Sequence, residues 1–311
     1  VTLDKSYSYT SSKIYSFNRW ACVGESSIFS DPFYSPGSDI IAINNTLTAG
    51  MIKADLAGNL TKENVDLLNT AMLDIVYPDQ ISYTRESYHT FGNTQVASAK
   101  FYWDTTYYWS LFAHPFLNGH FSDIGFVEEY VETIIKFSRL NRKVQQLFKL
   151  WANKTTSKAT FEFCDLARKY VFVNSAIELL TEPGRKEFVD FAQNKHERFE
   201  KMANALYIYA NRQFDLNPNE LGSEYDQDLV KLDNPLTKYT EKELSKEMNM
   251  FKEFFEPLSL SERIKIRYMQ FVANIDKGAF LYSVRGFYIR NFVHKRKRIQ
   301  LQGMLRLIFA D

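Results

Sequence analysis

The stretch RWACVGESSIFSDPFYSPGSDIIAINN, residues Arg19–Asn45, combines an apolar run, two acidic turn residues and a helix start in close succession. The apolar run Trp20–Val23 predicts a strand that ends at Gly24. From Ser38 onward the apolar residues follow helical spacing, which predicts a helix that ends near Gly58. A strand end and a helix N-terminus both present unpaired backbone groups, so this stretch predicts either a ligand-binding turn or an ordinary strand-to-helix connection.

The composition indicates a folded protein with a large apolar core and no dominant charge. The 311 residues are 45% apolar and 16% aromatic, which suits either aromatic packing or an aromatic-lined pocket for a flat ligand. The net charge of +1 indicates no nucleic-acid partner. The two cysteines, Cys22 and Cys164, match no metal-ligand pattern, so we expect no metal site and a reducing, cytoplasmic location. No apolar run has the roughly 18 residues that a transmembrane segment needs.

We expect a mainly α protein in which a short β-containing head precedes a helical C-terminal body. The segments 7–11 and 13–17 alternate as strands do and have no obvious partners. We therefore expect them to be edge strands of a sheet that lies N-terminal to this sequence in a longer chain. We expect the head to comprise residues 1–58 and the helical substrate or cover region residues 59–311.

Local signals place the helices of the body. Thr61 is a good N-cap with an Asn three residues later, and Pro78 predicts a kink or a restart. The Gly-Asn pair at 92–93 predicts a break within the aromatic segment 79–113, and residues 113–120 predict a loop. Apolar spacing near three or four predicts further helices, with a polar connection at 214–239; these helices are 123–138, 139–152, 156–179, 184–213, 240–255, 259–274 and 280–309.

Residues 20–45 resemble the second FAD-binding motif of flavoprotein monooxygenases, and in pattern most of all that of flavin-dependent halogenases and halogenase-like oxidoreductases. In that motif a strand leads to Gly-Asp, and an Asp-Pro pair, an aromatic pair, Ser-x-Gly and a helix follow in order. The corresponding letters here are VGE, DPFY and SPG. The resemblance is specific to this segment, while the helical remainder is similar only in general character. It implies the C-terminal portion of an α/β (GR2-type) flavoprotein.

The resemblance also implies which residues contact FAD. Glu25 stands where the family has an Asp that hydrogen-bonds the ribityl chain, and Asp31-Pro32 matches the pair beside the isoalloxazine ring. The helix start matches backbone amides that approach the flavin and, in halogenases, a halide; Pro36 has no N–H to offer a halide. The implied cofactor-binding residues are Gly24, Glu25, Asp31, Pro32, Ser35, Pro36 and Gly37.

The resemblance implies an FAD-dependent oxidoreductase of the halogenase-like monooxygenase class. Its substrate would be a small aromatic or carrier-bound molecule, and a flavin reductase is a candidate partner. The sequence contains no G-x-G-x-x-G and no W-x-W, so it holds neither the FAD phosphate fingerprint nor the Trp motif of true halogenases. The catalytic residues stay unidentified; His114, near Trp109 and Phe112, is a candidate for the wall of a substrate pocket.

Two alternatives stay open. The first keeps the flavin without oxygen chemistry, which gives a dehydrogenase or reductase. The second is a non-enzymatic helical interaction protein, in which residues 20–45 form an ordinary turn and the basic segment 294–298 belongs to a contact surface.

Overall fold

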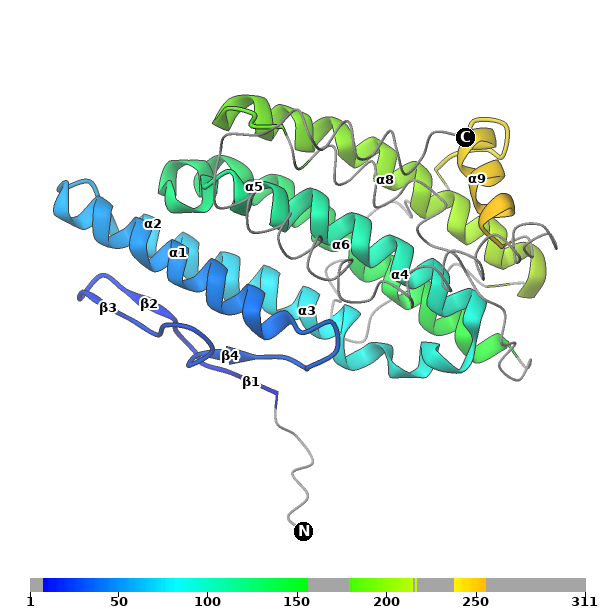
Figure 1. Ribbon diagram of the computed structural model, residues 1–311, viewed down its shortest axis with the longest axis horizontal. Helices are drawn as coiled ribbons and strands as arrows, with labels where there is room; N and C mark the ends of the chain where they lie inside the picture. Colours follow the sequence, from blue (N-terminus) through cyan, green and yellow to red (C-terminus); the bar gives the residue numbers. More distant parts are fainter. Residues whose placement is uncertain (1–7, 156–178, 180, 215, 217–237, 256–311) are drawn as a thin grey trace, which may run out of the picture. The chain divides into compact units, whose positions relative to one another are not determined.

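The computed structural model describes residues 8–155, 179, 181–214, 216 and 238–255 (Figure 1). This part of the chain is mainly helical and begins with a few short antiparallel strands, which confirms the expected fold class at that level. The expected helices at 259–274 and 280–309 lie outside the described residues, as do the basic segment 294–298 and most of 156–179 and 214–239.

The described elements are β1 (Tyr9–Thr10), β2 (Tyr15–Ser16), β3 (Trp20–Ala21), β4 (Ile28–Phe29), α1 (Pro36–Leu56), α2 (Lys62–Thr70), η1 (Ala71–Val76), α3 (Tyr77–Tyr83), η2 (Arg85–Gly92), α4 (Thr94–Tyr108), η3 (Trp109–Ala113), α5 (His114–Leu117), η4 (His120–Ser122), α6 (Ile124–Lys154), α8 (Arg185–Phe214) and α9 (Ser245–Phe255). The segments η1 and η3 are π-helical, and η2 and η4 are 3₁₀-helical.

The β head consists of two antiparallel pairs of strands. β1 pairs with β4, which places Tyr9 opposite Phe29, and β2 pairs with β3, which places Tyr15 opposite Ala21. β3 is shorter than the strand expected at 20–23. It ends at Ala21, and the chain turns at Gly24, which has a left-handed φ of 61°. No described strand is parallel to another, and the origin of the head in an FAD-binding sheet stays a prediction.

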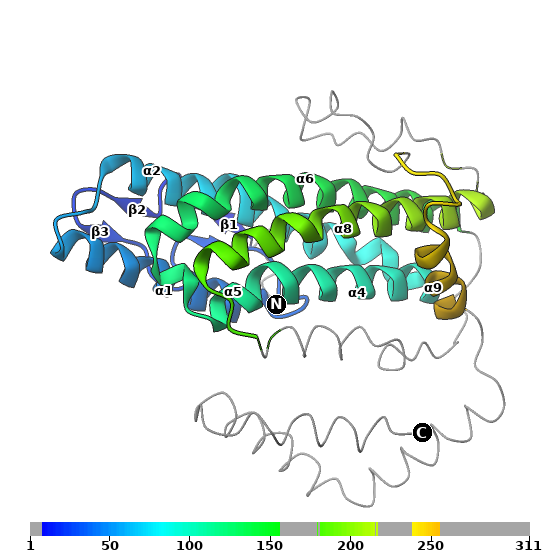
Figure 2. The same cartoon turned by 90° about the horizontal axis from the view of Figure 1, so that it is seen from above.

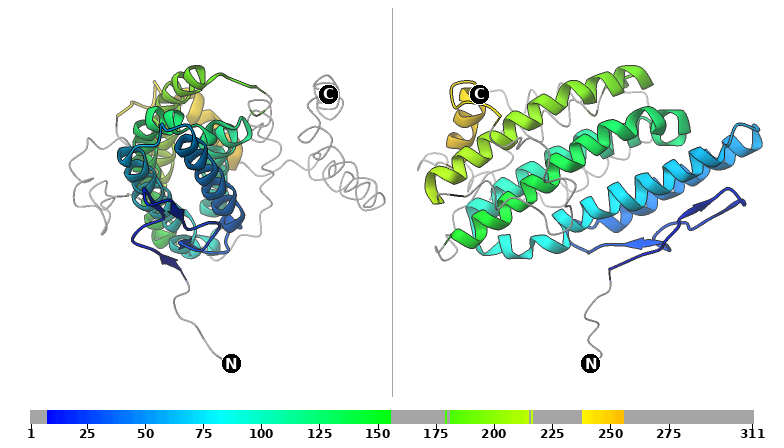
Figure 3. Two further views of the ribbon diagram at one scale, coloured as in Figure 1. Left: turned by 90° about the vertical axis from the view of Figure 1, so that its left-hand side faces the viewer. Right: turned by 180° about the vertical axis from the view of Figure 1, so that it is seen from behind.

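Two asparagines attach the β head to the first two helices, along which it lies (Figures 1 and 3). Asn69 of α2 accepts hydrogen bonds from the N–H groups of Ile14 and Tyr15 at 2.8 and 3.0 Å, and donates to the Tyr15 carbonyl at 2.9 Å. Asn44 of α1 is fully buried and accepts from the Tyr15 hydroxyl at 2.8 Å. Head and helices therefore share one hydrophobic core.

The starts of the helices follow local signals. α1 begins at Pro36, two residues before the expected start, because proline suits the first helical turn, where an N–H has no partner in the helix. The Thr61 side chain accepts from the Asn64 N–H, and the Asn64 side chain accepts in return from the Thr61 N–H, which confirms the expected cap of α2. Asn93 accepts from the Val96 N–H at 3.0 Å and caps α4, which confirms the expected break.

Pro78 changes the helix around it, as expected, without ending it. A proline offers no N–H to the carbonyl four residues earlier, and the turn before Pro78 widens into η1. The Asp74 carbonyl, which loses its usual partner, accepts instead from the Arg142 guanidinium of α6 at 3.3 Å. A side chain distant in sequence thus satisfies the backbone group that the proline leaves open.

The expected loop at 113–120 is wrong in its first half, and Pro115 explains why. The helix continues from α4 through η3 into α5, although Pro115 cannot donate to the Leu111 carbonyl. That carbonyl accepts from the Tyr130 hydroxyl of α6 at 3.0 Å. α5 ends at Leu117, and the chain turns at Gly119, which has a left-handed φ of 76°.

α6 is one helix of 31 residues where the sequence predicts two, at 123–138 and 139–152. It contains no proline, and its single glycine lies in its first turn, so nothing interrupts the ladder of backbone hydrogen bonds. The expected helices at 184–213 and 240–255 correspond to α8 and α9, the latter beginning later than expected.

α6 and α8 lie side by side and run in the same direction (Figures 1 and 2). Arg185 at the start of α8 forms ion pairs with Asp123 and Glu129 at the start of α6, at 3.2 and 2.7 Å. Between α4, α6 and α8 the core is aromatic: the ring of Phe199 meets those of Trp103 and Phe137 edge-on, with centroids 5.4 and 5.2 Å apart. Much of the aromatic content thus packs the core.

Candidate functional site

The turn between β3 and α1 is held in place by the helix that follows it. Gly24 adopts a left-handed conformation with a φ of 61°, which glycine tolerates best. Its N–H donates to the Asn45 side chain at 2.9 Å, and its carbonyl accepts from the Asn44 side chain at 2.8 Å. Because both asparagines belong to α1, the end of the strand and the helix are fixed to each other at this point.

The Glu25 carboxylate lies over Gly37 in the first turn of α1. A Cβ built on Gly37 would overlap the Glu25 oxygen Oε1 and would lie 3.1 Å from the carboxyl carbon. The positive end of the helix dipole stabilises a carboxylate at this place, and a glycine leaves room for it. An electron-rich edge of a ligand would find the same bare backbone and the same helix N-terminus.

Asp31 and Pro32 close the turn. The Asp31 side chain is 4% exposed, and its Oδ1 accepts from the Phe33 N–H at 2.8 Å and from the Tyr88 hydroxyl at 2.7 Å. The Pro32 carbonyl accepts from the Ser35 N–H at 2.8 Å, while the Pro32 ring is exposed. The Asp31 carboxylate is therefore engaged within the protein, whereas Pro32 and Ser35 are exposed at the surface of the turn.

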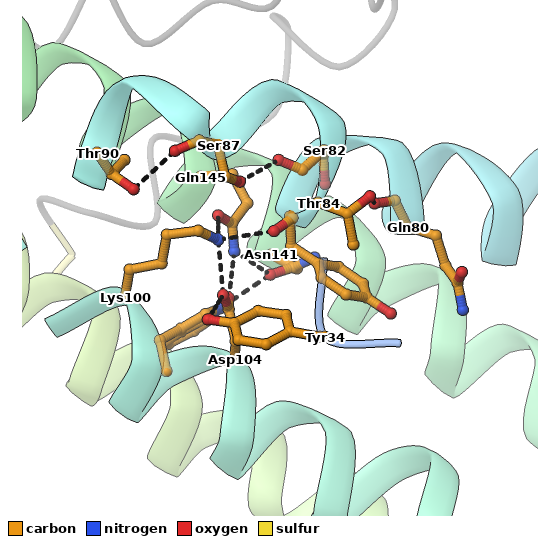
Figure 4. Close-up of polar contacts among 12 residues, drawn as sticks. Tyr34, Gln80, Ser82, Thr84, Ser87, Thr90, Lys100, Asp104, Asn141 and Gln145 are labelled. Carbon is orange, nitrogen blue, oxygen red and sulfur yellow. Dashed lines mark hydrogen bonds and ion pairs between the residues drawn. The ribbon is translucent and has the colours of Figure 1, made fainter. Parts of the chain in front are cut away.

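Tyr34 and Ser35 are consecutive left-handed residues, with φ of 66° and 57°. For residues with a Cβ this conformation costs roughly 1–2 kcal/mol each, so contacts around the turn have to hold it. The Tyr34 hydroxyl donates to Asp104 Oδ2 at 3.1 Å (Figure 4). Because Pro36 and Gly37 follow directly, this anchor also sets the geometry at the start of α1.

Asp104 belongs to a buried ion pair with Lys100, one turn earlier on α4 (Figure 4). Lys100 Nζ lies 2.6 Å from Asp104 Oδ2, and the two side chains are 1% and 6% exposed. Nζ also donates to the Tyr83 carbonyl at 3.0 Å and to Gln145 Oε1 at 2.7 Å, so each of its three N–H groups has an acceptor. Burial lowers the pKa of Lys100 and raises the pKa of Asp104, and the attraction between the two opposes both shifts.

Gln145 of α6 extends these contacts. Its amide group donates to Asp104 Oδ1 at 2.7 Å and to Asn141 Oδ1 at 3.1 Å. We call Tyr34, Lys100, Asp104, Asn141 and Gln145 the Asp104 network. It connects the turn before α1 with two long helices, so the turn rests on rigid elements.

Aromatic side chains lie beside the turn and are partly exposed. The ring of Phe91 meets those of Phe33 and Tyr88 edge-on, with centroids 4.8 and 5.6 Å apart. Tyr88 and Phe91 are 50% and 46% exposed. We call Phe33, Tyr88 and Phe91 the aromatic edge. It presents ring faces and edges next to the turn, which suits contact with a flat or apolar ligand.

His114 lies elsewhere. It is 1% exposed, and its ring meets that of Phe188 edge-on at 5.2 Å. The neighbouring segment η4 packs against the middle of α1, where a Cβ on Gly50 would lie 2.9 Å from the Ser122 carbonyl oxygen. Gly50 is about 20 Å along the helix from the turn. The structure thus brings Gly24, Glu25 and Gly37 together and leaves His114 in a separate aromatic cluster.

Sequence reasoning missed the residues that support the turn. Lys100 and Asp104 are spaced i, i+4, which is a signal for an ion pair on a helix, but it does not indicate burial. Tyr34 lies in the aromatic pair of the motif, but nothing local indicates its contact with Asp104; Tyr88 and Gln145 come from distant segments, and no local pattern singles them out.

Within the described residues no group of three or more His, Cys, Asp or Glu side chains is arranged to hold a metal ion. None of the described helices combines the length and the apolar character that crossing a membrane requires. Comparisons of the chain with models of protein families, with curated proteins and with solved structures found no match.

Proposed function

We propose that this chain supplies the flavin-facing turn of an FAD-dependent oxidoreductase of the halogenase-like monooxygenase class, which acts on an aromatic or carrier-bound substrate. The observation that supports the proposal is the position of Glu25 over Gly37. These two residues occupy corresponding places in the motif that residues 20–45 resemble, and the fold brings them together at a helix N-terminus.

The residues of the turn fit the flavin and ribityl portion of FAD. The Glu25 carboxylate can accept a hydrogen bond from a ribityl hydroxyl, and the bare backbone at Gly37 admits the edge of a flat ring. Because Glu25 covers Gly37 in this structure, its side chain would turn aside when a ring edge binds there. Pro36 offers no N–H, which weakens the case for a halide at the same place.

When bound, FAD would supply the redox chemistry, and this chain would supply position and surroundings. The Asp104 network would keep the turn in its left-handed geometry, and the aromatic edge would form part of the wall against which the substrate or the ring lies. The sequence contains no G-x-G-x-x-G, so the proposal covers the flavin and ribityl contacts and not those of the diphosphate.

A flavin titration of the protein made from the full-length gene tests the proposal. We expect the wild type to carry or take up FAD, and Gly37→Val to lose it, because a side chain there meets Glu25 or the ring edge. Glu25→Gln should weaken binding by about tenfold, which is about 1.4 kcal/mol for a charged acceptor made neutral. The matched control Glu132→Gln, at an exposed site on α6, should bind as the wild type does.

The result also separates the alternatives. A wild-type protein that takes up no FAD would refute the proposal and favour a helical interaction protein, for which the half-exposed rings of Tyr88 and Phe91 offer a contact surface. A protein that binds FAD but, once reduced, reacts with oxygen only as slowly as free flavin would be a dehydrogenase or reductase instead.

A further inference from the structure

An apolar cavity of about 50 Å³ lies between α1, the π-helical segment η1 and α6. α1 contributes Ile43 and Leu47 to its wall, η1 contributes Met72 and Ile75, and α6 contributes Val127 together with its neighbours. All five of these side chains are buried. Ala71, Val76, Phe112 and Val131, which also line it, are only half-buried, so the space is a hollow in the hydrophobic core that is open on one side.

The cavity is unsuited to water. Among the described side chains that line it, Tyr130 carries the one hydroxyl, and this hydroxyl already donates to the Leu111 carbonyl at 3.0 Å. A buried water needs two to four polar partners, and apolar cavities without them stay dry and take apolar guests. The chemistry of the wall thus selects an uncharged, apolar molecule.

The size of the cavity further restricts which molecules can bind in it. At about 50 Å³ it has roughly a third of the volume of the cavity of about 150 Å³ that accommodates benzene in another protein. An aromatic ring is therefore too large, whereas a single xenon atom or a diatomic gas molecule is small enough.

Two features connect the cavity with the candidate site. Its wall includes residues of both π-helical segments, η1 and, through Phe112, η3, and such widened turns occur frequently at functional sites. Ile43 and Leu47 lie seven and eleven residues after Pro36 on the same helix, which places the cavity about 10 to 16 Å along α1 from the turn.

We propose that this cavity is a docking site for dioxygen, an apolar diatomic molecule, on the same helix as the turn at which the flavin would react with it. The oxygen-dependent role rests on the function proposed above, whereas binding of the gas depends only on the cavity. Xenon, which is apolar and small, is the probe for the site.

Methyl NMR of the full chain tests binding without any flavin. Under xenon pressure we expect saturable shifts of the Met72 and Ile75 methyl signals. Dissolved dioxygen, which is paramagnetic, should increase the relaxation rates of the same signals. The double variant Val127→Ile/Val131→Ile fills the cavity and should lose at least half of both effects, while Val189→Ile, buried on α8 outside the cavity, should keep them.

Absence of xenon shifts at Met72 and Ile75, or equal effects in the filled variant, would overturn the proposal. In the flavin-loaded protein from the full-length gene, the filled variant should react with dioxygen at least threefold more slowly at limiting oxygen and bind FAD as the wild type does. An unchanged oxygen rate would overturn the dioxygen role even if xenon binds. Loss of FAD uptake by the wild type would refute the proposed function while the NMR result stands by itself.

Discussion

Lys100 and Asp104 offer the sharpest test of how the turn before α1 is supported. Their side chains are 1% and 6% exposed and their charged atoms lie 2.6 Å apart, so screening by solvent is small. Removing one partner of such a pair leaves a buried charge and typically costs about 3–5 kcal/mol. We therefore expect Lys100→Met and Asp104→Leu each to lower the free energy of unfolding by that amount. At ~2–4 °C per kcal/mol, the midpoint of thermal unfolding should fall by about 6–20 °C.

The double variant Lys100→Met/Asp104→Leu should be more stable than either single variant, because no unpaired charge remains. Its free energy of unfolding should stay below that of the wild type, because the Gln145 amide and the Tyr34 hydroxyl lose their acceptor. A buried polar group left without a partner costs about 1–3 kcal/mol. Urea unfolding of the four proteins gives the coupling energy. Single variants that each cost under 1 kcal/mol, or a double variant as unstable as the sum of the singles, would show that the two charges do not stabilise each other.

Three further predictions concern the fold. Asn69→Leu should cost about 2–4 kcal/mol, because it removes three hydrogen bonds to the backbone of Ile14 and Tyr15, and amide exchange should show faster opening of the head. Tyr130→Phe should lower the free energy of unfolding by about 1–3 kcal/mol, because it removes the hydroxyl that donates to the Leu111 carbonyl. Adding Pro115→Ala restores a backbone N–H and should recover part of this loss in urea unfolding. No recovery would contradict this role of the tyrosine. Burial lowers the pKa of His120, so its contribution to stability is complete above the unfolded value of 6.5 and is lost as the pH falls through the lower folded value. His120→Gln should flatten the decrease in unfolding free energy between pH 7 and pH 5, and an unchanged slope would contradict the assignment.

The fold was predictable where the signal is local. The capping pair of Thr61 and Asn64, the cap at Asn93 and the disturbance at Pro78 all depend on residues within one turn of each other, and the structure has all three. The sequence predicts a loop over 113–120, but its first half is helical because the Leu111 carbonyl finds its donor on another helix. A local pattern does not indicate a contact with Tyr130, because that residue is distant in sequence.

α6 also differs from the sequence prediction, because it is one helix and not two. Residues 123–152 suggest two helices, yet the backbone of α6 is continuous across 138 and 139. The polar side chain of Asn141 does not disturb it; this side chain accepts from the Trp103 indole N–H at 2.8 Å and from Gln145. Where a polar side chain has a tertiary partner, it need not compete for the backbone of its own helix. That partner cannot be read from the sequence of the helix.

Some contacts of the candidate site follow from the local sequence, and others depend on distant segments. The motif predicts that Gly24, Glu25 and Gly37 belong together, since a strand end, a turn and a helix start confine them to one place. It does not predict that Asp31 accepts from Tyr88 or that Tyr34 reaches Asp104, because these contacts depend on how η2 and α4 pack against the turn.

A crystal structure of the protein from the full-length gene, grown with FAD, decides whether the turn before α1 faces the flavin. We expect the flavin ring edge or the ribityl chain to lie within hydrogen-bond distance of Glu25 and of the backbone at Gly37, with the Glu25 side chain turned away from its present place over the glycine. A flavin bound at another place, or a turn that keeps Glu25 over Gly37 in crystals saturated with FAD and without flavin density, would contradict it.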